Sequence, residues 1–242
     1  MLNPDIALAL AIASAAGLMR GFAGVGSGML MAPFFVPIFG PVGTVGILTL
    51  IEAVVTVQLL PSVWNDIRWR VILPIGAAAT LTMPFGSWVL VSVDPATIQI
   101  GVALLVVVSA LILMTGWRYS GQRPLTADIG VGCMSGFLIS TTSIGNPPVI
   151  VYLLSGNDSA RTNRANFTGY FGLTLAALIV VMSIGGLFTK TIFVNAGALL
   201  PAFMLMVWVG SRLFNKANET LYRRIALSIL LLAGLYALFQ SF

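Results

Sequence analysis

Histidine is absent from this chain of 242 residues, cysteine occurs once, at Cys133, and charged residues make up only 8%. Without histidine the chain lacks the commonest zinc ligand and the usual proton carrier near neutral pH. A single cysteine excludes a disulfide within the chain, and no pair of catalytic side chains stands out. We therefore expect a protein that is not an enzyme and that holds no metal or cofactor.

Apolar residues make up 58% of the chain. Soluble domains carry about 25% charged residues, and spanning a bilayer takes about 20 consecutive apolar residues. The sequence therefore predicts an all-α polytopic membrane protein. Its apolar segments are 5–23, 29–39, 42–62, 71–92, 96–116, 128–141, 147–156, 166–187, 191–212 and 221–241. Segments 29–39 and 147–156 are too short to span.

The short segments lie beside two irregular stretches, RGFAGVGSGMLMAP at 20–33 and SGFLISTTSIGNPP at 135–148. Backbone polar groups cannot face lipid unpaired, so a broken helix at membrane depth must be buried in protein or line a cavity. Matching breaks in two halves of a chain are typical of a transporter binding site.

The two halves of the chain resemble each other. Arg20-Gly21-Phe22 lines up with Ser135-Gly136-Phe137, and Val25-Gly26 lines up with Ile144-Gly145. We predict two inverted-topology repeats, each a broken or re-entrant helix pair followed by three long transmembrane helices. The first repeat would cover 1–116 and the second 128–242, joined by a cytoplasmic linker at 117–127.

Basic residues set the predicted topology rather than indicating a nucleic-acid partner. If each broken pair returns to the face it came from, one side of the membrane holds Arg68, Arg70, Arg118, Arg123, Arg161, Arg164, Arg212, Lys216, Arg223 and Arg224. Only Lys190 falls on the other side. If each pair is instead one kinked crossing, the first four arginines lie opposite the later ones. The positive-inside rule favours the first arrangement.

The breaks themselves are candidates for an anion site. Glycines allow a tight turn, and a helix that starts there directs free N–H groups and its positive dipole end toward a ligand. The candidate binding residues are Gly26, Ser27 and Gly28 at the first break, and Thr141, Thr142, Ser143, Gly145 and Asn146 at the second. The alternative is that small residues here only permit close helix packing.

Three polar residues outside the breaks are further candidates. Arg20, at the end of an apolar run, could hold an oxyanion, or its side chain could extend to the membrane interface. Glu52 is an acidic residue deep in a span, with Thr49 and Thr56 on the same helix face. It could carry a proton or form a structural ion pair with Arg20. Asn166 is either a binding residue or the N-cap of the helix expected at 166–187.

Four stretches resemble the TauE/SafE family, also called the sulfite-exporter or TSUP family. They are GFAGVGSGMLMAPFF at 21–35, IEAVVTVQLLP at 51–61, which leads into DIRWRVILPI at 66–75, GFLISTTSIGNPPVIVYLL at 136–154 and SARTNRANFTGYF at 159–171. The resemblance extends over nearly the whole chain. The family usually carries a pattern of the form G-x-G-G-G at the first break, which Ser27 interrupts here, and Asn146 stands where the second break usually has glycine.

The resemblance implies a secondary transporter of a small sulfur-containing anion, such as sulfite or an organosulfonate like sulfoacetate. It would work by alternating access in a bacterial inner membrane, with Glu52 as the candidate for proton coupling. The alternative is a channel-like anion conduit in which the glycine breaks form a selectivity filter. The expected partners are the anion and the lipid bilayer, and a homodimer is compatible with the chain's size.

Overall fold

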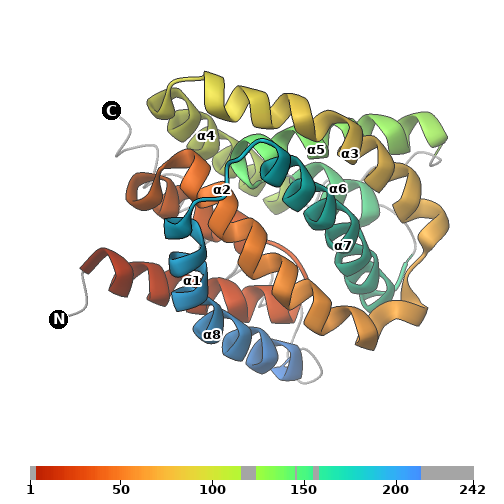
Figure 1. The fold of residues 1–242 in the computed structure, drawn as a ribbon. Coiled ribbons are helices and arrows are strands. Elements are labelled where there is room, and N and C mark those ends of the chain that lie inside the picture. Colours follow the sequence, from red (N-terminus) through yellow and green to blue (C-terminus); the bar gives the residue numbers. More distant parts are fainter. Residues whose placement is uncertain (1–3, 116–123, 145, 155–157, 214–242) are drawn as a thin grey trace.

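The computed structural model describes residues 4–115, 124–144, 146–154 and 158–213, and the described residues are helical with no strand (Figure 1). The helices are α1 Pro4–Ala23, α2 Ser27–Val63, α3 Trp69–Ser92, α4 Pro95–Met114, α5 Leu125–Thr142, α6 Asn146–Leu154, α7 Ala160–Ile184 and α8 Lys190–Leu213, with a 3-10 turn at Trp64–Asp66. The predicted all-α class is confirmed.

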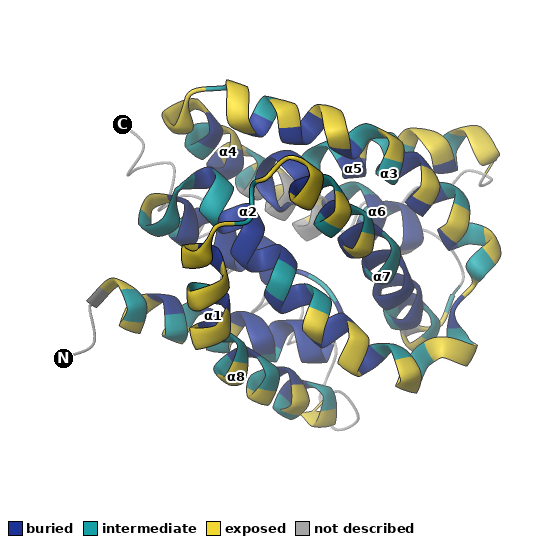
Figure 2. Ribbon diagram, viewed as in Figure 1, coloured by how far each residue is buried: buried dark blue, intermediate teal, exposed yellow. Residues whose placement is uncertain are grey.

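Five of these helices are long and apolar enough to cross a bilayer. Their outward faces carry large exposed apolar side chains, among them Ile184 at 83% and Leu81 at 81% exposure. Exposed positions follow the outer sides of the helices (Figure 2). In water such a surface would promote association, whereas lipid covers it without cost. The protein is therefore a multi-pass membrane protein.

Helix α2 is interrupted at Gly40, between the predicted segments 29–39 and 42–62. Gly40 has a φ of 73° and a ψ of 166°, outside the helical region, and Pro41 follows it. Glycine tolerates the positive φ, and proline has no N–H to continue the helical hydrogen bonding. The chain therefore forms a short piece before Gly40 and a long piece after it, with Glu52 near the centre of the long piece.

The most extensive helix contacts join α1 to α8 and α5 to α3. Both contacts are close because glycines leave the backbones bare. A Cβ on Gly17 would lie 2.6 Å from the Phe203 carbonyl oxygen, and a Cβ on Gly136 would overlap the Ala79 carbonyl oxygen. Helices α2 and α7 cross the middle of the view between these two pairs and contact each other (Figure 1).

Two ion pairs join the α2–α3 connection to the start of α7. Arg68 Nη1 lies 2.5 Å from Asp158 Oδ1, and Arg161 Nε lies 2.7 Å from Asp66 Oδ2. Arginines of the two halves therefore lie on one face of the molecule. This excludes the arrangement in which each broken pair is a single kinked crossing, because that arrangement puts Arg68 opposite Arg161.

Some predicted boundaries differ from the observed ones. Helix α7 begins at Ala160 rather than at 166, because Ser159 Oγ accepts a hydrogen bond from the Thr162 N–H at 3.1 Å and caps the helix. Helix α5 begins at Leu125, inside the predicted linker 117–127, most of which lies outside the described residues together with the predicted helix 221–241.

Candidate functional site

The two breaks meet inside the bundle. After α1, Gly24 and Gly26 have φ angles of 78° and 96°, and α2 then starts at Ser27. After α5, Ser143 has a φ of 60°. A Cβ placed on Gly28 would lie 2.7 Å from the Ser143 carbonyl oxygen. The first turn of α2 therefore touches the second break, as the anion-site prediction requires.

A small cavity lies beside this contact. It has a volume of about 20 Å³ and is lined by Gly28, Leu48, Thr49, Glu52, Ile139, Ser143, Phe171, Leu175 and Leu178. A single water needs a volume of about 10–15 Å³ measured in this way. The cavity therefore holds about one water and excludes a sulfonate, so the site is closed in this structure.

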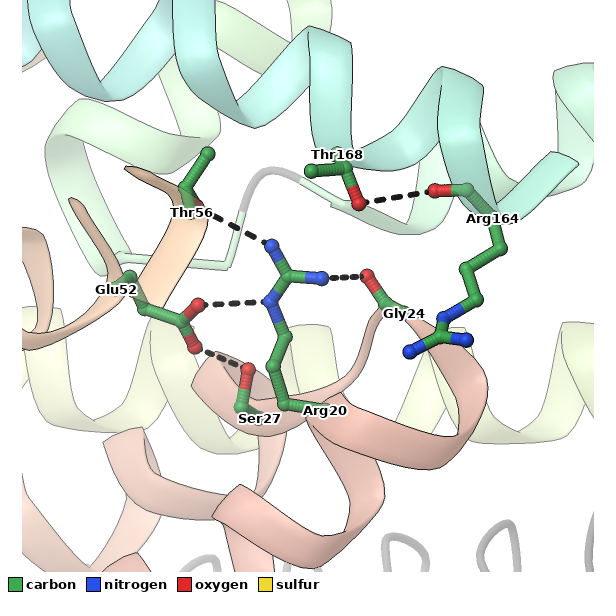
Figure 3. Close-up of polar contacts among 7 residues, drawn as sticks. All are labelled: Arg20, Gly24, Ser27, Glu52, Thr56, Arg164 and Thr168. Carbon is green, nitrogen blue, oxygen red and sulfur yellow. Dashed lines mark hydrogen bonds and ion pairs between the residues drawn. The ribbon is translucent and has the colours of Figure 1, made fainter. Parts of the chain in front are cut away.

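Arg20 is fully buried, with 0% of its surface exposed. Its Nε donates to Glu52 Oε2 at 2.9 Å, Nη1 donates to the Gly24 carbonyl and Nη2 donates to Thr56 Oγ1 at 3.3 Å (Figure 3). Its guanidinium carbon lies 4.5 Å from the centre of the Phe171 ring. The side chain points into the protein, so the interfacial alternative for Arg20 is wrong.

Glu52 is 5% exposed and is held from both sides. One carboxylate oxygen accepts from Arg20, and the other accepts from the Ser27 hydroxyl at the first turn of α2 (Figure 3). A buried ion pair is tolerated when its members are also hydrogen-bonded, and here each guanidinium nitrogen and each carboxylate oxygen has a partner. The ion pair with Arg20 is one of the two alternatives that the sequence left open for Glu52, and Thr56 lies near it on the same helix face, as the helical spacing indicated.

The predicted hydroxyls of the second break have different surroundings. Thr141 Oγ1 donates to the Phe137 carbonyl at 2.8 Å and lies 3.1 Å from the Gly86 carbonyl on α3, away from the cavity. Thr142 Oγ1 donates to the Leu138 carbonyl at 2.7 Å and accepts from the Ile144 N–H at 3.1 Å. Ser143 Oγ is buried, lines the cavity and has no hydrogen-bond partner among the described residues. Of these three hydroxyls, Ser143 is the one available to a ligand in the cavity.

The remaining candidates are Asn166, which lies away from the cavity, and the neighbours Gly145 and Asn146 of the second break. Asn166 lies within α7, fully buried, and its Oδ1 accepts from the Arg68 N–H at 2.8 Å. It is therefore not an N-cap, and it fixes the α2–α3 connection rather than touching the cavity. Asn146 is the first residue of α6, and Gly145 lies outside the described residues.

Two residues near the break were missed by the sequence reading. Arg164, expected to be a cytoplasmic flank, donates from Nη2 to the Gly21 carbonyl at 2.8 Å and packs against Gly24. Phe171 lies between Arg20 and the cavity. Arg164, Thr168 and Phe171 follow helical spacing on α7, so the period of that helix places them on one face once its start is known.

The chain matches the family model described as sulfite exporter TauE/SafE over residues 9–237. No curated protein and no solved structure matches it. The matched range contains both breaks, Arg20 and Glu52, and the family is one of membrane transporters rather than enzymes. This protein belongs to the sulfite exporter TauE/SafE family.

Proposed function

We propose that this protein is a secondary transporter that moves a small sulfur-containing anion across a bacterial inner membrane by alternating access. One observation carries the proposal: a fully buried arginine, neutralised by Glu52, lies where the two helix breaks meet. A guanidinium binds a sulfonate as it binds a carboxylate, through paired N–H donors. The site therefore already holds a carboxylate where an anion would bind.

The Glu52 carboxylate on Arg20 can couple the movement of the anion to that of a proton. An anion can take Arg20 from Glu52 only if the negative charge of Glu52 is removed, because two anions beside one buried cation leave one charge uncompensated. Protonation of Glu52 removes that charge and leaves Ser27 Oγ and Arg20 free to turn to the anion. Proton and anion then bind together and leave together.

The contact between Gly28 and Ser143 gives alternating access a physical basis. The anion enters only if the two breaks separate, since the cavity between them holds about one water. The first break follows α1, which packs closely on α8, and the second follows α5, which packs closely on α3, so the movement displaces the α1–α8 pair against the α3–α5 pair. The matching contacts of Gly17 with Phe203 and of Gly136 with Ala79 support two halves of similar structure.

The lining of the cavity suits an organosulfonate such as sulfoacetate better than a bare oxyanion. Ile139, Leu175 and Leu178 line the cavity together with Glu52. A short carbon chain gains by covering such side chains, at about 0.8 kcal/mol for each buried CH₂. Sulfite has no carbon to place there.

Uptake into vesicles that contain the purified protein tests the proposal, with sulfite, sulfoacetate and thiosulfate as substrates. We expect saturable uptake, fastest for sulfoacetate. Arg20→Ala should reduce uptake about 10- to 100-fold, the equivalent of charge-assisted hydrogen bonds worth about 1.5–3 kcal/mol. Asn146→Ala should also reduce uptake, because it removes a candidate binding residue of the second break.

Arg212→Gln is the matched control, because the Arg212 side chain is exposed and lies over the Trp208 ring near the end of α8, so it takes no part in the Arg20–Glu52 pair. Unchanged uptake in both the Arg20 and Asn146 variants would disprove the site. Flux that does not saturate with substrate concentration would favour the channel-like conduit instead.

A further inference from the structure

A second, larger cavity shares Phe171 with the small one and is lined by residues of α2, α7 and the start of α3. It has a volume of about 320 Å³, and we call it the lateral groove. Its lining includes Thr56, Val57, Trp64, Trp69, Phe171 and Ala176. Val57 is 70% exposed and Trp64 is 51% exposed. The groove therefore opens on the outer surface of the bundle, where lipid lies.

Water is a poor occupant of the lateral groove. Ordered waters inside proteins make about three hydrogen bonds each. The one lining residue with a hydroxyl is Thr56, and that hydroxyl already accepts from Arg20. An empty apolar space loses dispersion contacts on its whole lining. A hydrocarbon chain restores those contacts without burying a polar group.

One end of the groove has the character of a membrane interface. The rings of Trp64 and Trp69 lie there with centres 4.9 Å apart, and tryptophan is enriched at headgroup depth. Arg68 and Arg70 flank Trp69 in the chain, and both are exposed. Arg68 is paired with Asp158, whereas Arg70 makes no ion pair with any described residue.

We propose that the lateral groove binds an anionic phospholipid, with its phosphate at Arg70 and one acyl chain against Phe171. Basic residues between helices on the cytoplasmic side of a membrane are a recognised feature of anionic lipid sites. Arg70 lies on the face predicted to be cytoplasmic. Its charge, which no described residue pairs, complements a phosphate, and the tryptophans beside it in the chain suit the glycerol region.

The same groove reaches the candidate anion site. Phe171 lines both the groove and the small cavity, and its ring lies against the Arg20 guanidinium. Thr56 lines the groove and accepts from Arg20. An acyl chain in the groove holds Phe171 and Thr56 in place, so it also holds Arg20. This coupling rests on the proposed function, whereas lipid binding does not.

Native mass spectrometry of the full chain, released from vesicles of equal phosphatidylglycerol and phosphatidylcholine, tests the binding. We expect one retained phosphatidylglycerol. Arg70→Gln should lower its preference over phosphatidylcholine about fivefold, the contribution of one arginine at an anionic surface. Ala176→Trp, which fills the groove, should abolish retention. Arg212→Gln and Ala77→Trp, an exposed position outside the groove, are the controls and should retain the lipid.

Equal retention of the two lipids, or retention by the Ala176→Trp variant, would overturn the proposal. So would a dimer that this variant dissociates, since a second copy would then occupy the groove. For the coupling, we expect anion uptake severalfold slower in vesicles of phosphatidylcholine alone, and equal uptake would refute it. If the protein moves none of the tested anions, the proposed function fails while lipid retention still decides the groove.

Discussion

Arg20 and Glu52 are each costly to bury alone, and each makes the burial of the other tolerable. Removing one member of a buried ion pair typically costs about 3–5 kcal/mol. Ser27, Thr56 and the Gly24 carbonyl add hydrogen bonds to the pair. A state in which an anion holds Arg20 must therefore also neutralise Glu52, and that requirement leads to a test at a single residue.

Glu52→Gln should separate binding from coupling. Glutamine is neutral at every pH, so it carries no proton, but it leaves Arg20 available to the anion. We expect the variant to lose accumulation of the anion driven by a pH gradient, while exchange of labelled for unlabelled anion continues at a rate close to that of the unaltered protein. Vesicle assays of accumulation and exchange measure the two activities separately.

A structural role for the pair predicts a different result. The double variant Arg20→Gln/Glu52→Gln keeps a neutral hydrogen-bonded pair of similar size and leaves no buried charge. If the pair only stabilises the fold, this variant should unfold near the temperature of the unaltered protein and still transport. We expect it to fold and to lose transport, and accumulation by Glu52→Gln alone would contradict the coupling role.

At the scale of helices, bare backbone at a few glycines sets how closely α1 and α5 approach their partners. Gly86 on α3 lies against the Phe137 carbonyl, just as Gly210 on α8 lies against the Leu18 carbonyl. Small residues at such crossings allow the van der Waals contact that holds helices together in lipid. The breaks that follow α1 and α5 are therefore supported from behind by tightly packed helix pairs.

Two glycines of α5 give a matched pair of substitutions. Gly136→Ala should destabilise the protein by about 1–3 kcal/mol, because its methyl group meets the Ala79 backbone, which cannot move aside as a flexible side chain can. Gly130→Ala should be neutral or stabilising by up to about 1 kcal/mol, because nothing lies within 4 Å of its Cβ position. Thermal unfolding in detergent measures both. Equal effects would show that helix propensity, rather than packing, controls α5.

The parts of this site that depend on neighbouring residues in the chain could be predicted from the sequence. The parts that depend on contacts between distant helices could not. The glycines at 24–28 and the helical spacing of Glu52 and Thr56 act through neighbours in the chain, so the sequence indicated them. The polar run at 161–166 resembles a loop, and it is helical because Ser159 caps it. The contact of Arg164 with Gly21 depends on how α7 crosses α1, which no local pattern contains.

At the scale of the molecule, the contacts relate the two halves more closely than the sequence alignment did. Gly17 and Gly136 make equivalent contacts, and they are as far apart in the chain as Gly24 and Ser143, which end α1 and α5 with positive φ. The alignment based on contacts agrees with the sequence alignment in pairing Val25-Gly26 with Ile144-Gly145. It differs at Gly136, which it pairs with Gly17 rather than with Gly21, one helical turn away. An inverted repeat stays a prediction that these contacts favour.

The halves are also joined at one end of the molecule by two crossed ion pairs. Arg68 and Asp66 belong to the α2–α3 connection, and they pair with Asp158 and Arg161 at the start of α7. The side chain of Asp158 is 2% exposed, whereas that of Arg161 is 76% exposed, so the first pair is the stronger constraint. Asn166 adds a hydrogen bond to the Arg68 N–H. These contacts close the face predicted to be cytoplasmic.

Asp158→Asn should open that face. Without the carboxylate, Arg68 loses its charge partner and the α2–α3 connection is freed from α7, so the breaks become more accessible from the same side. A single reporter thiol, Ser143→Cys in a Cys133→Ser background, measures access by its reaction with a membrane-impermeant reagent added to either face. We expect severalfold faster labelling from the arginine-rich face in the Asp158→Asn variant and no change in a Lys190→Gln control.

Exchanging the charges, with Asp66→Arg and Arg161→Asp together, should keep labelling slow, whereas each substitution alone should speed it. Faster labelling from the opposite face would show that the crossed ion pairs hold the protein open rather than closed.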